Sequence, residues 1–579
     1  MSDAYQRYRS LESPVPAETW AWNMYGAGLE NIGRNGQPER FELAAPGPDQ
    51  LLVRVDAVGM CFSDVKLIKQ GSKHPKLYDR DLAIEPTRLG HEVALTVVRV
   101  GSALEGRFHS GQRLALQPDI YQQGRSTAYG YTIPGGLTQY HLMGPEVLDA
   151  EGKSYVLPLP GDLGYAETAL TEPWACVEAA YTQRRRLEPR PGGAMWIIGQ
   201  PGDTTAYGCT QGLAAPAAFV LTDVPPGLAA QVAEQARSRG ATVIVENGVA
   251  PARYAELRAA LTAGAGFDDV IVLGPRSALA VGEAARMVAR RGTFNVVGDA
   301  ALDGLVQVDV GRIHYDYIAF LGNPGPDAGA SYGEARNRCE LRAGGVALFV
   351  GAAGPMGQMH IQRALELGDG PAVVIASDTN AVRLAAMVAR LLPLATARGR
   401  RLVPVGPGQS LGELIGQHSG GRGADDVIVS VPVGEVMAEA ATYMAADGML
   451  VLFAGVPNGT YAPLDLAKVY LHGAQYTGTS GSALADQAVV VDKALGGKLS
   501  PARSVGAVGG LEAAVDGMRA MIDGRFSGKV LIFPQLRGLP LTAVDELART
   551  DPEIAAGLGP DGMWTAAAEA ALFKRYWTP

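Results

Sequence analysis

Residues 344–357 read GGVALFVGAAGPMG: two glycines, a five-residue apolar run and a loop rich in glycine. Residues 192–199 read GGAMWIIG and repeat the first half of this pattern. Three further pairs of segments recur in the same order, GFDDVIVLGP (266–275) with GADDVIVSVP (423–432), RRGTFNVVGD (290–299) with ADGMLVLFAG (446–455), and DVGRIHYDYIAFLGNPG (309–325) with DLAKVYLHGAQYTGTSG (465–481). Four paired blocks in one order indicate an internal duplication.

Each copy alternates short aliphatic runs with segments of helical period, as in VALFV, QMHIQRALEL and AVVIAS. Strands that alternate with helices predict a parallel sheet covered on both faces. We therefore expect an α/β protein with two tandem doubly wound domains, over residues 186–335 and 336–484. Residues 1–185 carry strand-like stretches broken by Gly and Pro and predict a β-rich domain, and residues 485–579 add helices and the strand KVLIF (529–533).

The composition excludes several classes of protein. Glycine supplies 74 of 579 residues, and charged residues are only 19%, as in α/β proteins with many tight turns. A net charge of −9 provides no basic surface for nucleic acid. The start, MSDAYQRYRSLESPVP, lacks the apolar centre of a signal peptide, and no apolar run reaches the ~18 residues of a membrane span. We expect a cytoplasmic protein.

The glycine loop of the second copy predicts a dinucleotide site. Gly351, Gly354 and Gly357 allow a tight turn and close approach of a pyrophosphate, and a helix that begins near Pro355-Met356 supplies N–H donors. Asp378 ends the next strand, where a carboxylate accepts hydrogen bonds from a ribose 2′-hydroxyl, so NAD is favoured over NADP. Arg383 is added to the same cofactor-binding set. The alternative is that these glycines only make a tight turn.

The first copy has a different loop, Gly199-Gln200-Pro201-Gly202-Asp203-Thr204-Thr205. Thr205 replaces the third glycine, and Asp203 is expected to cap the following helix and repel a pyrophosphate. We therefore predict a degenerate cofactor domain. Asp223 still ends the second strand, which leaves an adenosine-like ligand as an alternative.

Three segments before the duplication carry residue types that suit a catalytic metal. Cys61 lies in GMCFSD (59–64), His91 and Glu92 in RLGHEVAL (88–95), and Glu172 in TEPWAC (171–176). Zinc binds thiolate, imidazole and carboxylate ligands and keeps one position open in catalytic sites. A single Cys or His is more often a buried or structural residue, so the residue types alone are a weak signal.

The order of these motifs resembles the zinc-dependent medium-chain alcohol dehydrogenases. The matching segments are Cys61-x-Ser63-Asp64, Gly90-His91-Glu92, GQR (111–113), Gly135-Gly136, Glu172-Pro173 and GKV (528–530). Segments LQPDIYQQGRSTAYGYTIPGG (116–136) and PLTAVDELARTDP (540–552) are most similar to the L-sorbose-1-phosphate reductase-like branch. The resemblance implies a GroES-like catalytic domain split between 1–185 and 485–579, with 186–335 as an inserted duplicate of the Rossmann-like domain at 336–484.

The resemblance also implies a set of site residues and a reaction. One catalytic Zn2+ would be held by Cys61, His91 and Glu172, with Glu92 as an exchanging or supporting carboxylate. Ser63 would relay the alcohol proton, and Asp64 would orient its neighbours or only cap a turn. Lys66 stands where many members have a relay histidine. The four cysteines, Cys61, Cys176, Cys209 and Cys339, are too dispersed for the family's structural zinc.

The implied reaction is hydride transfer between NAD(H) and a secondary alcohol or ketone, with a polyol or ketose as substrate. A substrate phosphate would need a basic partner such as Lys66, Lys69 or Arg88, and an unphosphorylated alcohol fits equally. The alternatives are a non-catalytic tandem nucleotide-binding protein and, less favoured, a zinc-free quinone reductase. Because exposed sheet edges need a partner, residues 315–322 and 474–480 are expected to pair within one chain and imitate a dimer; a homo-oligomer remains the alternative.

Overall fold

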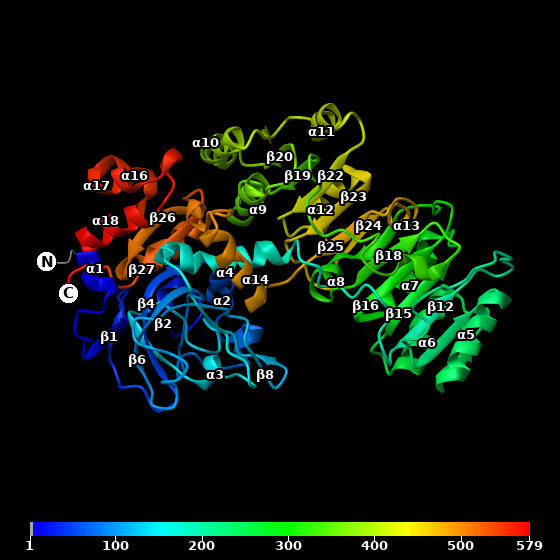
Figure 1. The fold of residues 1–579 in the computed structure, drawn as a ribbon, viewed down its shortest axis with the longest axis horizontal. Coiled ribbons are helices and arrows are strands. Elements are labelled where there is room, and N and C mark those ends of the chain that lie inside the picture. Colours follow the sequence, from blue (N-terminus) through cyan, green and yellow to red (C-terminus); the bar gives the residue numbers. More distant parts are fainter. Residues whose placement is uncertain (1–3) are drawn as a thin grey trace. The chain divides into compact units, whose positions relative to one another are not determined.

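The computed structural model describes residues 4–579, which form two compact units (Figure 1). The first unit combines residues 4–179 with 481–579, and the second comprises residues 180–480. The predicted α/β class with parallel Rossmann-like sheets is confirmed. No helix in the described part of the chain is long and apolar enough to cross a membrane.

The first unit is built on an eight-stranded sheet that joins both ends of the chain. Its order is β11-β7-β6-β4-β27-β26-β28, with β10 also paired to β4. The strands are β4 (Leu51–Gly59), β6 (Glu92–Val100), β7 (Arg113–Leu116), β10 (Tyr140–Met143), β11 (Val156–Pro158), β26 (Val505–Gly510), β27 (Lys529–Phe533) and β28 (Thr542–Ala543). Because β27 pairs antiparallel with β4, the C-terminal segment completes the N-terminal sheet.

The central helix of the first unit is α4 (Tyr165–Ala179), which packs against β4, β6 and α14 (Leu484–Leu495). Its first turn is capped from a distant part of the sequence. Glu569, in α18 (Ala566–Tyr576), accepts hydrogen bonds from Tyr165 N and Ala166 N at 2.7 and 2.8 Å. These N–H groups have no partner inside α4, so the buried carboxylate satisfies them and fixes α18 against the helix.

The second unit contains two six-stranded parallel sheets with the same strand order, β14-β13-β12-β15-β16-β18 and β21-β20-β19-β22-β23-β25. This is the order of doubly wound dinucleotide-binding folds. The first sheet comprises β12 (Ala194–Ile198), β13 (Ala218–Thr222), β14 (Thr242–Val245), β15 (Phe267–Leu273), β16 (Val288–Val297) and β18 (Ala319–Asn323). The second comprises β19 (Val346–Val350), β20 (Val373–Ser377), β21 (Arg401–Val405), β22 (Ala424–Val429), β23 (Met444–Leu452) and β25 (Gln475–Gly478).

Matching polar contacts hold the first strand of each sheet. Asp268 accepts a hydrogen bond from Ala194 N at 2.9 Å, and Asp425 accepts one from Val346 N at 2.8 Å. Arg186 pairs with the next residue, Asp269, and Arg338 pairs in the same way with Asp426. The two halves of the second unit therefore share polar contacts as well as strand order.

The halves differ after their first strands. In the second, β19 leads through the glycine loop into α9 (Pro355–Glu366). In the first, residues 199–217 form no helix, so the prediction that Asp203 caps a helix is wrong; Asp203 instead accepts a hydrogen bond from Thr205 N within the loop. Gly and Pro at positions such as Gly208, Gly212 and Pro216 disfavour a helix there, and side chains from the irregular segment fill the core in its place.

The two sheets contact each other through reciprocal elements. Strand β17 (Val306–Asp309) pairs antiparallel with β24 (Tyr461–Leu464). Helix α8 (Val310–Tyr315) contacts β25, and α13 (Ala467–His472) contacts β18. The edge strands β18 and β25 touch but belong to separate sheets, so the expected pairing of 315–322 with 474–480 is wrong; the antiparallel ladder is formed by β17 and β24.

Glycines at equivalent positions permit this close approach. A Cβ atom on Gly322 of β18 would lie 2.6 Å from Tyr470 Cβ of α13 and 2.7 Å from Val296 O. A Cβ atom on Gly478 of β25 would lie 2.7 Å from Leu452 O and 3.5 Å from His314 Cα of α8. Each helix thus packs on the other half's edge strand where that strand carries glycine, in the manner of a two-fold interface.

Candidate active site

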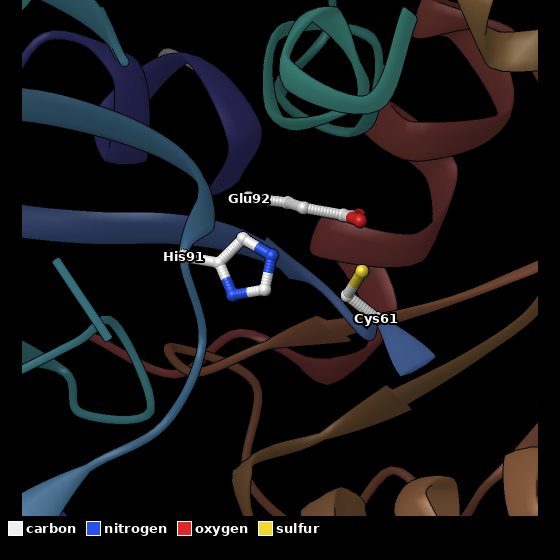
Figure 2. Close-up of side chains that lie close together, drawn as sticks. All are labelled: Cys61, His91 and Glu92. Carbon is white, nitrogen blue, oxygen red and sulfur yellow. The ribbon is translucent and has the colours of Figure 1, made fainter. Parts of the chain in front are cut away.

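Three residues with metal-binding side chains meet in the first unit. Cys61, His91 and Glu92 place one ligand atom each within 4.8 Å of one another (Figure 2). Cys61 follows β4 and is the N-cap of α2 (Phe62–Gln70), while Glu92 begins β6. Since Gly59 of β4 lies opposite Glu92 in the antiparallel ladder, strand pairing brings the two motifs together.

The donor set fits a divalent metal. Glu92 is fully buried, and its Oε2 atom has no hydrogen-bond partner among residues 4–579. An unpaired buried carboxylate oxygen is costly unless a cation or a donor compensates it. A thiolate, an imidazole and a carboxylate are also the ligand types of catalytic zinc sites. The residues present therefore suit zinc.

Lys529 neutralises the other oxygen of Glu92. Its Nζ atom lies 2.5 Å from Glu92 Oε1, and both side chains are buried. Burial by itself lowers the pKa of Lys529, but Glu92 and then Cys61 raise it, and the net shift is upward. The site therefore holds a permanent ammonium beside the ligand cluster. The sequence identifies GKV (528–530) as a family motif but predicts no role for Lys529.

Asp64 contacts two members of the cluster. It is fully buried, accepts a hydrogen bond from Cys61 N at 3.0 Å, and places Oδ1 3.3 Å from His91 Nδ1. A carboxylate beside one imidazole nitrogen fixes the ring's orientation and leaves the other nitrogen for a metal. Ser63 Oγ lies 3.3 Å from that second nitrogen, His91 Nε2.

Glu172 lies on α4 near the cluster but outside the group of ligand atoms within 4.8 Å that the described residues form. Burial raises the pKa of Glu172 to about 7; His91 opposes the rise, and Glu92 and Asp119 add to it. Its Oε1 atom lies 3.9 Å from Cys176 Sγ, one helical turn further along. The structure thus places Glu172 close enough to interact electrostatically with His91 and Glu92.

Further side chains near His91 were missed from sequence. The Tyr131 ring centroid lies 5.9 Å from that of His91, and Lys76 Nζ lies 4.9 Å above the Tyr131 ring. Lys76 also pairs with Asp119 at 3.0 Å. Tyr131 and Asp119 lie in the segment 116–136, whose similarity assigns no role to single residues, and Lys76 lies outside the quoted motifs. Only the fold therefore shows these residues together.

The basic residues considered for a substrate phosphate differ in their surroundings. Lys66 and Lys69 are exposed on α2. Arg88 lines a cavity whose lining contains none of Cys61, His91, Glu92 and Glu172.

The glycine loop in the second unit has the geometry expected of a nucleotide-binding turn. Gly351 has φ +77°, and Gly354 is the N-cap of α9, with Pro355 and Met356 as its first helical residues. A Cβ atom on Gly357 would lie 2.3 Å from Gly351 O, so only glycine fits there.

Asp378 lies directly beside this loop. It accepts hydrogen bonds from Ala353 N and Asn380 N, both at 2.9 Å. Arg383 places its guanidinium 3.9 Å from Asp378 Oδ1. In the first half, the corresponding Asp223 accepts a hydrogen bond from Gly248 N.

Comparison with known proteins matches residues 47–150 to the alcohol dehydrogenase GroES-like domain. The chain is 31% identical over 305 residues to the uncharacterized protein YggP of Escherichia coli, covering 49% of this chain and 70% of the relative. It is 30% identical over 283 residues to the uncharacterized zinc-type alcohol dehydrogenase-like protein YdjJ of the same organism, covering 46% and 74%. It is 23% identical over 567 residues to the L-sorbose 1-phosphate reductase of Klebsiella pneumoniae, covering 96% and 97%.

These matches and the site define an oxidoreductase of the alcohol dehydrogenase class. The chain belongs to the zinc-type medium-chain alcohol dehydrogenase family, which confirms the resemblance drawn from the motifs.

Proposed function

We propose that this chain is a zinc- and nicotinamide-dependent dehydrogenase that interconverts a polyol or polyol phosphate with the corresponding ketose. The observation that carries the proposal is the cluster of Cys61, His91 and Glu92 with an uncompensated carboxylate oxygen. The substrate class follows the sorbose 1-phosphate reductase relative, which matches almost the whole length of the chain. A cytoplasmic location remains a prediction.

Cys61, His91 and a carboxylate are proposed to hold one zinc ion. Glu172 is the third ligand in this proposal, and Glu92 exchanges with it or supports it. A bound zinc supplies a Lewis acid that polarises the substrate oxygen. Lys529 keeps one oxygen of Glu92 occupied, so the other oxygen is the one free to act.

Ser63 is proposed to take the proton from the substrate hydroxyl. Its hydroxyl sits in the first turn of α2, and Ser63 Oγ lies 3.3 Å from His91 Nε2. A positioned hydroxyl can pass a proton onward when it is itself hydrogen-bonded. Asp64 acts through His91 and Cys61 as a positioning residue. Lys66 stands where many members of the family have a relay histidine, so we propose no residue for the relay beyond Ser63.

The loop Gly351–Gly357 and the N-terminus of α9 are proposed to bind the pyrophosphate of the cofactor. Asp378 would accept hydrogen bonds from the adenosine ribose and repel a 2′-phosphate, which favours NAD. Arg383 lies close enough to soften this preference, because an arginine at this place can pair with a 2′-phosphate.

A substrate screen tests the proposal. Sorbitol, mannitol, their phosphates and simple secondary alcohols are each offered with NAD and with NADP, and turnover is read at the nicotinamide absorbance band. We expect activity with a polyol or polyol phosphate, a higher kcat/KM with NAD, and about one zinc per chain. A zinc-loaded protein that turns over none of these substrates and does not enhance NADH fluorescence would refute the proposal.

A further inference from the structure

The first unit contains a cavity of about 220 Å3 whose lining does not include the candidate metal ligands. Its walls come from β5 (Thr87–Arg88), the loop at 129–134, β10 and α3 (Pro145–Leu148). This volume is below the roughly 300–1,000 Å3 of drug-sized ligand pockets, so the cavity suits only a small organic molecule.

Arg88 is the cation of this lining. Its Nε atom donates to Asn23 Oδ1 at 3.3 Å, and within residues 4–579 its terminal guanidinium nitrogens have no hydrogen-bond or ion-pair partner. Burial lowers the pKa of Arg88 to about 10, so the side chain is still charged at neutral pH. A largely buried guanidinium without an anion is unfavourable, and carboxylates and phosphates match its planar donors.

His141 and Tyr129 add polarity to the wall but no charge. Tyr129 Oη lies 2.8 Å from His141 Nε2, and His141 Nδ1 lies 3.1 Å from Leu142 O. Burial, and then Arg88, lower the pKa of His141 to about 3, so the imidazole is neutral. Its Nδ1–H therefore donates to the carbonyl, and Nε2 accepts from the tyrosine.

Glu146 gives the cavity a second kind of contact. Its Oε1 accepts a hydrogen bond from Gly144 N at 2.8 Å, which leaves Oε2 without a partner in the described chain. A carboxylate in the wall disfavours a bare anion but accepts readily from hydroxyl groups. Ile133 and Met143 complete the lining with apolar surface for carbon-bound hydrogens.

We propose that this cavity binds a small organic anion that also carries hydroxyl groups, with its anionic group on Arg88 and a hydroxyl on Glu146. A sugar acid or a polyol phosphate has this chemistry. The inference does not depend on the proposed dehydrogenase function, because it uses none of the proposed zinc or cofactor residues.

Isothermal titration of the full-length protein with gluconate, inorganic phosphate and sorbitol tests the inference. Gluconate offers both kinds of group, whereas phosphate has only the charge and sorbitol only the hydroxyls. We expect gluconate to bind more tightly than either. Arg88→Met should weaken gluconate at least about tenfold, since a hydrogen bond to a charged group is lost. Arg99→Met, at an exposed position of β6, is the matched control.

Two further variants separate this cavity from the catalytic site and guard against misfolding. Cys61→Ser should leave gluconate binding intact, whereas binding that disappears with Cys61→Ser belongs to the metal site and overturns the inference. Glu146→Ala should lower the ratio of gluconate affinity to phosphate affinity, because both anions gain from the lost negative charge but only gluconate loses a hydroxyl acceptor. If Arg88→Met has a clearly lower melting temperature than the parent protein, the Glu146→Ala result tests the inference in its place. The inference is also overturned if gluconate does not bind, if a folded Arg88→Met protein binds it unchanged, or if Glu146→Ala leaves the ratio of gluconate to phosphate affinity unchanged.

Discussion

At the scale of single residues, the buried pair of Lys529 and Glu92 controls the electrostatics of the candidate zinc site. Glu92 carries one neutralised and one uncompensated oxygen, and the two residues lie 437 positions apart in the chain. Removing one member of a buried pair leaves the other charge desolvated and unpaired, which is far more costly than removing both.

A double-mutant cycle measures this dependence. Lys529→Met should lower the free energy of unfolding by about 3–5 kcal/mol, because Glu92 loses its partner. Lys529→Met combined with Glu92→Gln should recover much of that loss. Urea unfolding of the metal-free single and double variants supplies the numbers. Strictly additive effects would show that the pair is not coupled as the 2.5 Å contact implies.

A second prediction concerns Asp64, whose carboxylate accepts a hydrogen bond from Cys61 N and lies beside His91 Nδ1. Asp64→Asn keeps the shape but loses the charge, and supporting carboxylates of this kind are typically worth about 10–100-fold in metal affinity or activity. We expect a loss of that size in zinc affinity, measured by competition with a chelator, together with a lower kcat. Asp49→Asn, at an exposed position, is the control. Unchanged zinc affinity would mean that Asp64 only caps helix α2 and does not support the metal ligands.

At the scale of elements, the two halves of the second unit differ in the segment that comes directly after the first strand. The second half has the loop Gly351–Gly357 and α9, and the first has the irregular segment 199–217. A helix N-terminus provides oriented N–H donors and a positive dipole end, which an irregular segment does not. Only the second half therefore keeps the element that the proposed pyrophosphate site requires.

A substitution at Gly357 tests the proposed pyrophosphate site. Gly357→Ala forces a Cβ atom to within 2.3 Å of Gly351 O, so the loop must shift. We expect the KM for NAD to rise at least about tenfold, since hydrogen bonds to a charged group are worth about 1.5–3 kcal/mol each. Gly368→Ala, where a Cβ atom meets nothing within 4 Å, should behave like the parent enzyme. Equal KM values for parent and Gly357→Ala proteins would mean that the cofactor does not use this loop.

At the scale of the whole molecule, we propose that residues 186–335 are an inserted duplicate domain that serves as a built-in partner for residues 336–484. The reciprocal contacts of α8 with β25 and α13 with β18, around the β17–β24 ladder, have the form of an isologous interface. A chain that contains both sides of such an interface has no need of a second copy to cover it.

Deletion of residues 186–335 should expose β24 and β25. We expect the shortened protein to dimerise or aggregate, because an unpaired strand edge exposes backbone N–H and C=O groups that can pair with another chain. The full-length chain should sediment as a monomer over the same concentration range. A soluble, monomeric and active deletion protein would contradict the role proposed for the duplicate.

The sequence by itself determined the fold class, the duplication and the residue types of the candidate metal site, because periodicity and short motifs are local properties. Cys61, His91 and Glu92 each lie in such a motif. The glycine loop with Asp378 was also visible, since its parts occupy one strand–helix–strand unit.

Only the tertiary structure decided which residues complete these sites. Lys529 reaches Glu92 because the returning strand β27 pairs with β4. Tyr131 lies beside His91, and Lys76 lies over the Tyr131 ring, although these residues come from separate segments of the chain. The missing helix after β12 was not foreseen, because strand-like runs on both sides suggested a regular unit. Likewise, the sequence did not show that β17 pairs with β24 between the two halves. Pairing between strands far apart in the chain depends on how the halves pack, and the local sequence pattern does not give this.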